Sequence, residues 1–221
     1  MVDPGGEVRP AAAPPSSRGR LRGDPSVRIA VWVIGALVLA AAALVFFAVN
    51  RPEPPAWAPT PHGELGRLDD AGARITTVDA SSPDDWRFFS FERGVLPGRA
   101  AGLDWDLAFR RFHIIANGGE GFAGRAAIAA LGPVPFESVG EVPAATFEPT
   151  AIARGDSVNR AIDRWYRYGF TSHLLTPLGH TWLVRPAEGG ALVKLEVLGY
   201  YCPRATPGCV TFRWAPLPAH R

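Results

Sequence analysis

Three histidines and two cysteines are the residues best able to bind a ligand or form a covalent cross-link. The histidines are His113, His173 and His180, and the cysteines are Cys202 and Cys209. A neutral imidazole nitrogen is a common ligand of transition metals and of the iron in a tetrapyrrole. We therefore treat the three histidines as candidate nitrogen ligands for a haem-type iron.

The sequence context of the three histidines differs. His113 lies in the apolar stretch "DWDLAFRRFHIIANGG", residues 104–119, where alternation predicts a strand that turns at the Asn-Gly-Gly. A lone histidine on such a strand is more often a hydrogen-bonded core residue than a ligand. His173 and His180 flank the turn-like segment "LLTPLG", and loops frequently carry functional residues. The context therefore favours His173 and His180 as ligands and a structural role for His113.

The two cysteines are spaced for a disulfide. In "YYCPRATPGCVTF", Cys202 and Cys209 stand on the two sides of a turn that contains proline and glycine. Strands that flank such a turn lie about 4.5–5.5 Å apart, which is within disulfide reach. The alternative is a metal-binding or redox pair. It fits less well, because six residues separate the cysteines and the chain contains no other.

An uncharged apolar stretch of 21 residues, 29–49, predicts a transmembrane helix. At about 1.5 Å rise per residue it spans a hydrocarbon core roughly 30 Å thick. The alternative is a cleaved signal peptide, but the preceding region is long and no good Ala-x-Ala site follows. Five arginines precede the stretch and only Arg51 follows it closely, which predicts a cytoplasmic N-terminus.

These observations predict a single-pass protein of a bacterial inner membrane with its C-terminal domain in the periplasm. An oxidising periplasm agrees with the predicted disulfide. The lipid bilayer is the expected partner of residues 29–49. A small-residue face of this helix also suits close packing in a membrane protein complex, and it consists of Gly35, Ala36, Ala40 and Ala43. The formal net charge of +2 gives no indication of nucleic-acid binding.

The chain divides by composition into four segments. Residues 1–28 are rich in Pro, Ala, Gly and Arg without apolar periodicity, which predicts a disordered cytoplasmic tail. The transmembrane helix at 29–49 follows. Residues 50–66 are rich in proline and predict a semi-extended spacer. The folded domain is expected at 67–217.

Strand patterns dominate the domain. Alternating stretches occur in "WRFFSFERG", "HTWLVRP", "ALVKLEVLGYY" and "CVTFRWA", and the last three are predicted to form an antiparallel meander. One helix is expected in "DSVNRAIDRWYRYGF", residues 156–170, with Asp156 or Ser157 as its N-cap and Gly169 at its end. The predicted class is mainly β with a minor α+β character, an antiparallel sheet domain with one or two short helices.

Motifs for catalysis are weak, which predicts a non-enzymatic protein. "GEGFAG", residues 119–124, matches a dinucleotide fingerprint only formally, because no helix and second parallel strand follow. It is expected to be a loop between strands. Ser157 in "RGDSVN" lacks a nearby base and acid for nucleophilic catalysis.

Four segments in order resemble the HmuY family. They are "WRFFSFERG", "DWDLAFRRFHIIANGG", "WYRYGFTSHLLTPLGH" and "TWLVRPAEGGALVKLEVLGYY", within residues 86–214. The resemblance implies a mostly antiparallel β fold and haem binding by an extracytoplasmic haemophore through axial side chains. Two functions are therefore expected. The first is a membrane-anchored haem- or tetrapyrrole-binding domain, and the alternative is an accessory subunit of a respiratory or photosynthetic complex that binds no haem.

Overall fold

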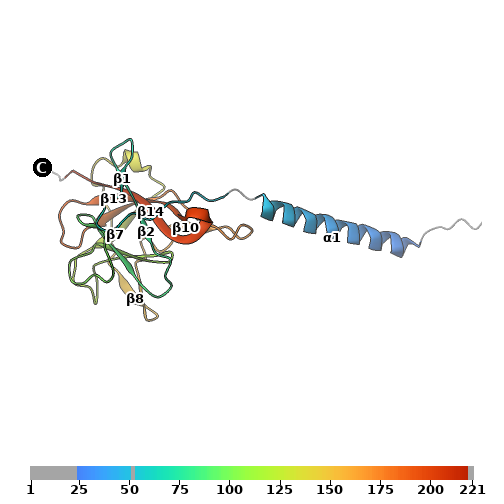
Figure 1. Ribbon diagram of the computed structural model, residues 1–221, viewed down its shortest axis with the longest axis horizontal. Coiled ribbons are helices and arrows are strands. Elements are labelled where there is room, and N and C mark those ends of the chain that lie inside the picture. The colour runs from blue at the N-terminus through green and yellow to red at the C-terminus, as the bar shows by residue number, and fades with distance from the viewer. Residues whose placement is uncertain (1–23, 51–52, 219–221) are drawn as a thin grey trace, which may run out of the picture. The chain divides into compact units, whose positions relative to one another are not determined.

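The computed structural model describes residues 24–50 and 53–218, which belong to two units of the chain. The first unit ends at Arg51 and the second begins at Pro52. The described residues of the first unit form one long helix, and those of the second form a β domain (Figure 1). Positions 1–23 of the predicted tail lie outside the described residues.

Helix α1 (Pro25–Val49) begins at two sequence signals for a helix start. The side chain of Asp24 accepts a hydrogen bond from the N–H of Ser26, and Pro25 occupies the first turn, where no backbone donor is needed. The helix therefore starts four residues before the predicted boundary at position 29. None of its residues is buried, and it is long and apolar enough to cross a membrane. The predicted N-terminal apolar helix is confirmed.

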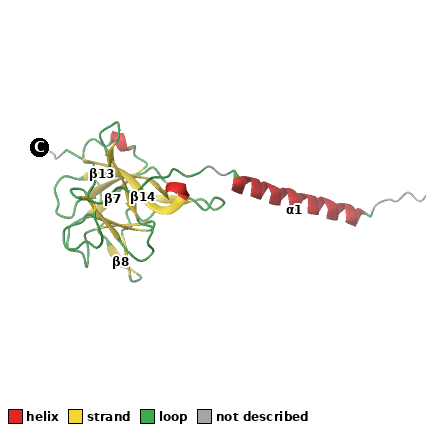
Figure 2. Ribbon diagram, viewed as in Figure 1, coloured by secondary structure: helices red, strands yellow, loops and turns green. Residues whose placement is uncertain are grey.

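Two antiparallel sheets form most of the β domain (Figure 2). The larger sheet has six strands in the order β1-β2-β14-β13-β12-β7, and the smaller has four in the order β4-β3-β5-β6. Two separate hairpins are β8–β9 and β10–β11. The elements are β1 (Arg67–Leu68), β2 (Arg74–Asp79), β3 (Arg87–Ser90), β4 (Gly94–Val95), β5 (Leu107–Arg110), β6 (His113–Ala116), β7 (Ala127–Gly132), η1 (Phe136–Ser138), β8 (Ala151–Ala153), β9 (Asp156–Val158), β10 (Tyr166–Tyr168), β11 (Leu175–Pro177), β12 (Thr181–Arg185), β13 (Val193–Cys202), η2 (Pro203–Ala205) and β14 (Thr206–Pro216).

The predicted class and the predicted meander are both confirmed. β13 pairs antiparallel with β12 on one side and with β14 on the other. β14 also pairs with β2, so the last strand lies inside the six-stranded sheet. The two short helices are the 3-10 turns η1 and η2.

Aromatic side chains from both sheets form the main core. Phe89 on β3 and Phe109 on β5 face Phe212 on β14, with ring centroids 5.2 Å and 5.3 Å away. All three side chains are at most 1% exposed. Burying a side chain of this size contributes about 1.5–3 kcal/mol. The alternation that places these rings inward therefore holds the two sheets together.

A buried carboxylate, Asp106, also joins the two sheets. One of its oxygens accepts a hydrogen bond from the N–H of Phe91, which follows β3, and the other accepts from the N–H of Ala187, which follows β12. Both bonds are 2.8 Å long. Because both oxygens have backbone donors, the charge is compensated despite its burial.

The Asn-Gly-Gly sequence after β6 is a packing motif as well as a turn. The side-chain amide of Asn117 donates to the carbonyl oxygens of Gly102 and Trp105, at 2.9 and 2.8 Å. A Cβ atom at Gly118 or Gly119 would lie 2.0 or 2.1 Å from a facing carbonyl oxygen. Only glycine therefore fits at either position.

The stretch 104–119 is a hairpin, and the single strand predicted for it is wrong. β5 ends at Arg110 and β6 begins at His113, and these two residues pair with each other. Arg111 turns the chain in a left-handed conformation with φ of 54°, and its side chain donates to the carbonyl of Ser81. Arginine is an uncommon residue in this conformation, so the sequence carries no ordinary turn signal there.

The helix predicted at 156–170 is also wrong, because this segment forms β9, a turn and β10. Ile162 and Trp165 have helical spacing and both are fully buried. The chain makes one turn over residues 159–163, closed by the N–H of Asp163 donating to the carbonyl of Asn159, and Trp165 follows this turn. The indole of Trp165 donates to the carbonyl of Phe112 in the neighbouring hairpin. Burial against distant strands thus outweighs the local helical pattern.

The predicted spacer at 50–66 is part of the folded unit in its described part, 53–66. Its backbone bonds to the domain at three points, from Trp57 to Tyr201 (2.8 Å), from Thr60 to Thr77 (2.9 Å) and from Gly63 to Val95 (2.8 Å). Proline prevents helix formation in this segment but leaves these N–H groups free to pair with strands. The described part of the predicted semi-extended spacer therefore lies along the β domain.

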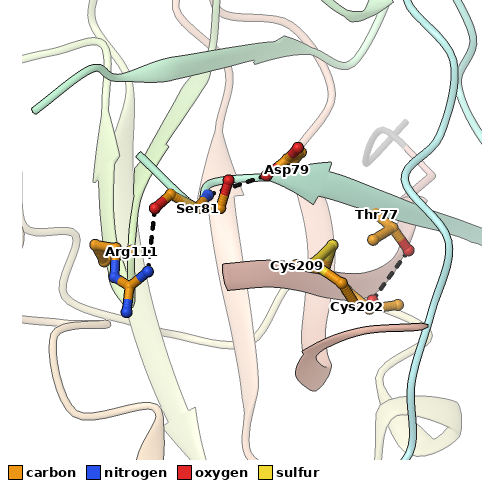
Figure 3. The surroundings of a disulfide bond; sticks show 7 residues. Thr77, Asp79, Ser81, Arg111, Cys202 and Cys209 are labelled. Carbon is orange, nitrogen blue, oxygen red and sulfur yellow. Dashed lines mark hydrogen bonds between the residues drawn. A yellow bond between two sulfur atoms is a disulfide. The ribbon is translucent and has the colours of Figure 1, made fainter. Parts of the chain in front are cut away.

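The predicted disulfide joins Cys202 at the end of β13 to Cys209 in β14 (Figure 3). The two Cα atoms are 4.9 Å apart. Asp79 is the cross-strand partner of Cys209, and its carboxylate is near both sulfur atoms. Because the sulfurs are bonded to each other, they offer no thiolate to a metal. The structure supports the disulfide over the alternative metal or redox pair.

Replacing Asp106 with Ala should destabilise the domain by about 3 kcal/mol, because two buried N–H groups would lose their acceptor. Urea unfolding of the full chain in detergent, followed by tryptophan fluorescence, measures this loss. Asp104→Ala is the matched control, because Asp104 is an exposed carboxylate paired with Arg93. Equal losses in the two variants would contradict the structural role of Asp106.

Breaking the disulfide with the double change Cys202→Ser and Cys209→Ser should cost about 2.5 kcal/mol, the chain-entropy value for so short a loop. The same unfolding experiment measures it. We expect dithiothreitol to destabilise the parent chain by a similar amount and to leave the double variant unchanged. If dithiothreitol does not change the free energy of unfolding of the parent chain, the cross-link is absent.

Candidate functional site

A cavity of about 460 Å³ lies between β11, β13 and the segment at 53–55. Its size falls within the range of small-molecule binding pockets. We call it the Tyr201 pocket. It is lined by Glu53, Pro54, Pro55, Leu174, Leu175, Thr176, Pro177, Gly179, Glu196, Val197, Leu198, Gly199, Tyr200 and Tyr201.

The β13 side of the Tyr201 pocket is irregular. The pairing of β13 with β14 shifts register on both sides of Gly199, and such bulges often occur beside functional sites. A Cβ at Gly199 would lie 2.9 Å from the indole nitrogen of Trp57. Trp57 therefore packs directly on the strand, and this contact requires glycine.

Two tyrosine hydroxyls of the pocket have different roles. The hydroxyl of Tyr201 accepts a hydrogen bond of 2.8 Å from the N–H of Leu175, which ties β11 to β13. The hydroxyl of Tyr200 is buried and, within the described residues, has no hydrogen-bond partner. Burial raises the pKa of Tyr200, so its phenol stays protonated at neutral pH. The ring of Tyr200 packs beside Trp165 in the main core.

The β13 carboxylate in the pocket is already paired. Glu196 accepts a hydrogen bond of 2.6 Å from the guanidinium of Arg213, which also bonds to Glu137 at 2.5 Å. The charge of Glu196 is therefore neutralised within the protein. The rest of the lining is mostly aliphatic, aromatic and proline side chains, which suits an apolar ligand.

His173 lies at one end of the pocket's β11 side. It precedes Leu174 in the loop between β10 and β11, with a left-handed φ of 55°. The hydroxyl of Tyr168 is 2.5 Å from its Nδ1 atom. This contact orients the ring and leaves Nε2 for an iron, which is the usual way a protein positions a histidine ligand.

His180 lies at the other end of the same segment, directly after Gly179, and its ring is 5.9 Å from that of Trp182. His113 lies elsewhere, at the start of β6, with its Nδ1 3.8 Å from a carboxylate oxygen of Asp163. Neither His173 nor His180 lines the cavity itself. In residues 53–218, no hydrogen bond or ring contact joins any two of these histidines. Their role as axial ligands stays a prediction.

A second hollow of about 260 Å³ surrounds Asp106 and Arg93. Both oxygens of Asp106 accept backbone hydrogen bonds, and Arg93 pairs with Asp104. Asp106 and Arg93 thus already have partners within the protein. The predicted glycine loop at 119–124 connects β6 and β7, and no helix follows it, as expected.

Sequence reasoning did not identify Tyr200, Tyr201 and the Pro54–Pro55 pair as site residues. One signal was present, because Gly199 interrupts a strand pattern, and such a glycine often marks a bulge or a close backbone approach. The proline pair carries no comparable signal, because its contact with β13 is set by the fold.

The structure is a two-sheet antiparallel β domain with a mostly apolar cavity. Similar folds occur in solved structures. The apo HmuY analogue TFO of Tannerella forsythia is 16% identical, with a TM-score of 0.53, and the match covers 66% of this chain and 96% of that one. A Bacteroides vulgatus protein, described as HmuY-like and heme-binding, is also 16% identical, with a TM-score of 0.56 and coverage of 71% and 100%. At these identities the likeness shows the fold.

The family model described as HmuY protein matches residues 82–214. The chain belongs to the HmuY family. The matched residues include the Asp106 and Asn117 contacts and most of the Tyr201 pocket. A comparison with curated proteins found no match.

Replacing Tyr201 with Phe should loosen β11 from β13, because the N–H of Leu175 loses its acceptor. We expect the Leu175 amide to exchange with solvent faster by about fivefold, equivalent to about 1 kcal/mol. Amide hydrogen exchange of the full chain measures this. Tyr200→Phe is the control, since its hydroxyl bonds to no described residue, and unchanged exchange in both variants would contradict the assigned bond.

Proposed function

We propose that the chain is a non-enzymatic, membrane-anchored periplasmic binding protein whose HmuY domain takes haem or a related tetrapyrrole in the Tyr201 pocket. The observation that carries this proposal is the position of His173 and His180. They stand at the two ends of the segment that forms the β11 side of an apolar cavity.

The residues at the Tyr201 pocket fit a tetrapyrrole chemically. Aliphatic and proline side chains suit the flat apolar faces of the macrocycle. Imidazole is the side chain that most often holds haem iron. His173 and His180 would supply it, and bound haem would bring ligand-binding or redox chemistry to the site.

The anchor supports a periplasmic location. Arginines precede α1, so its N-terminal side is expected in the cytoplasm. The disulfide between Cys202 and Cys209 is consistent with an oxidising compartment on the other side. In the same fold, a Bacteroides fragilis protein described as a lipoprotein is 16% identical over 71% of this chain and 97% of that one, with a TM-score of 0.51.

Haemin titration of the full chain in nanodiscs tests the proposal. We expect a saturable shift of the Soret band, and about tenfold or more weaker binding after His173→Ala or His180→Ala. His62→Ala is the matched control, because His62 is an exposed histidine outside the Tyr201 pocket.

The double variant His173→Ala and His180→Ala corrects for haemin that dissolves in the lipid. A titration curve that is the same for the parent chain and the double variant would overturn the assignment of these ligands. Loss of the shift in His113→Ala alone would instead place the iron at the β5–β6 hairpin.

A second candidate function is an accessory subunit of a larger membrane complex, such as a respiratory or photosynthetic one. It is favoured by the small-residue face of α1, which consists of Gly35, Ala36, Ala40 and Ala43. Extraction of the full chain in mild detergent should then recover stable partner proteins. Ala36→Leu with Ala40→Leu should release them, and Val45→Leu on another face should not. Repeated recovery of the chain alone would exclude this function.

A further inference from the structure

The hairpin β10–β11 exposes large apolar side chains. Phe170 is 85% exposed, Tyr168 is 50% exposed and Leu178 is 39% exposed. The only other exposed large hydrophobic residues among positions 53–218 are Leu68, Leu103 and Ile152, which are far apart in sequence. Apolar side chains that gather on one protruding element usually mark a contact surface.

Phe170 lies in a loop closed by backbone hydrogen bonds. They run from Gly169 to the carbonyl of Leu174 (2.8 Å) and from His173 to the carbonyl of Gly169 (2.7 Å). In this closed loop the side chain of Phe170 is exposed.

The charge of the hairpin has one sign. The segment 164–180 contains Arg164, Arg167 and two histidines, and it contains no carboxylate. Both arginines are exposed and make no ion pair in the described residues. Exposed aromatic rings beside arginines are typical of segments that lie at a membrane surface and contact anionic lipid headgroups.

The pocket and the proposed anchor are close in sequence. β11 lines the Tyr201 pocket together with Glu53, and Glu53 follows the last residue of α1, Val49, by four positions.

We infer that the β10–β11 hairpin contacts the outer surface of the bilayer, with Phe170 and Tyr168 at the level of the headgroups and Arg164 and Arg167 on anionic lipid phosphates. The contact places the opening of the Tyr201 pocket beside the membrane. This inference rests on the proposed anchoring of the chain by α1.

A spin label at Phe170→Cys in the full chain tests the contact. The chain is placed in nanodiscs that contain phosphatidylglycerol and phosphatidylcholine, and collision rates of the label with oxygen and with a water-soluble nickel complex are measured. Ile152→Cys is the matched control, because Ile152 is also an exposed apolar residue, 56% exposed, but lies on the β8–β9 hairpin.

We expect the ratio of oxygen to nickel collisions to be several-fold higher at Phe170→Cys than at Ile152→Cys. Adding Arg164→Glu and Arg167→Glu should lower it toward the control. Equal ratios at the two positions in nanodisc-bound chain would overturn the hairpin contact alone. A chain that does not co-elute with nanodiscs would overturn the contact and the proposed anchoring together. A label that is immobilised yet shielded from oxygen would indicate a protein contact and overturn the lipid assignment.

Discussion

The fold depends on a charged group that is buried and fully hydrogen-bonded. Asp106 accepts one backbone bond from the end of each of two strands, β3 and β12, which belong to different sheets. A buried carboxylate is tolerated only when such donors are fixed in place. The aromatic packing between the sheets fixes them, so the charge and the core depend on each other. Asp106 in the Asp-x-Ala-Phe sequence and Asn117 in the Asn-Gly-Gly sequence thus both make buried hydrogen bonds that set the architecture.

Features that depend on local sequence were predictable. The apolar helix, the three-stranded meander and the disulfide each follow from a run, an alternation or a spacing within a few residues, and the structure confirms all three. The errors occur where distant contacts override local pattern. Trp165 has the spacing of a helix, but its indole bonds to Phe112 in another hairpin. Arg111 forms a turn at a position without an ordinary turn residue. Its side chain donates to the carbonyl of Ser81, a distant contact that the local sequence does not predict.

The candidate site shows the same division. The sequence indicated the segment between His173 and His180, because imidazole is a common iron ligand and loops often carry functional residues. It did not indicate that Tyr200 and Tyr201 would face this segment, or that Pro54 and Pro55 would complete the cavity. Those neighbours are brought together by the hydrogen bond from the N–H of Leu175 on β11 to the Tyr201 hydroxyl on the bulged β13, and by a proline-rich segment that packs on the domain.

The chain combines a HmuY domain, an apolar pocket with two histidines beside its lining residues, and an apolar helix. In sequence, this helix ends four residues before the first residue of the pocket. Electron paramagnetic resonance of ferric haem bound to the full chain tests most directly whether His173 and His180 hold the haem iron. We predict a low-spin signal from two histidine ligands. This signal should disappear in the variant His173→Ala. A high-spin signal that is identical in the parent chain and this variant would contradict it.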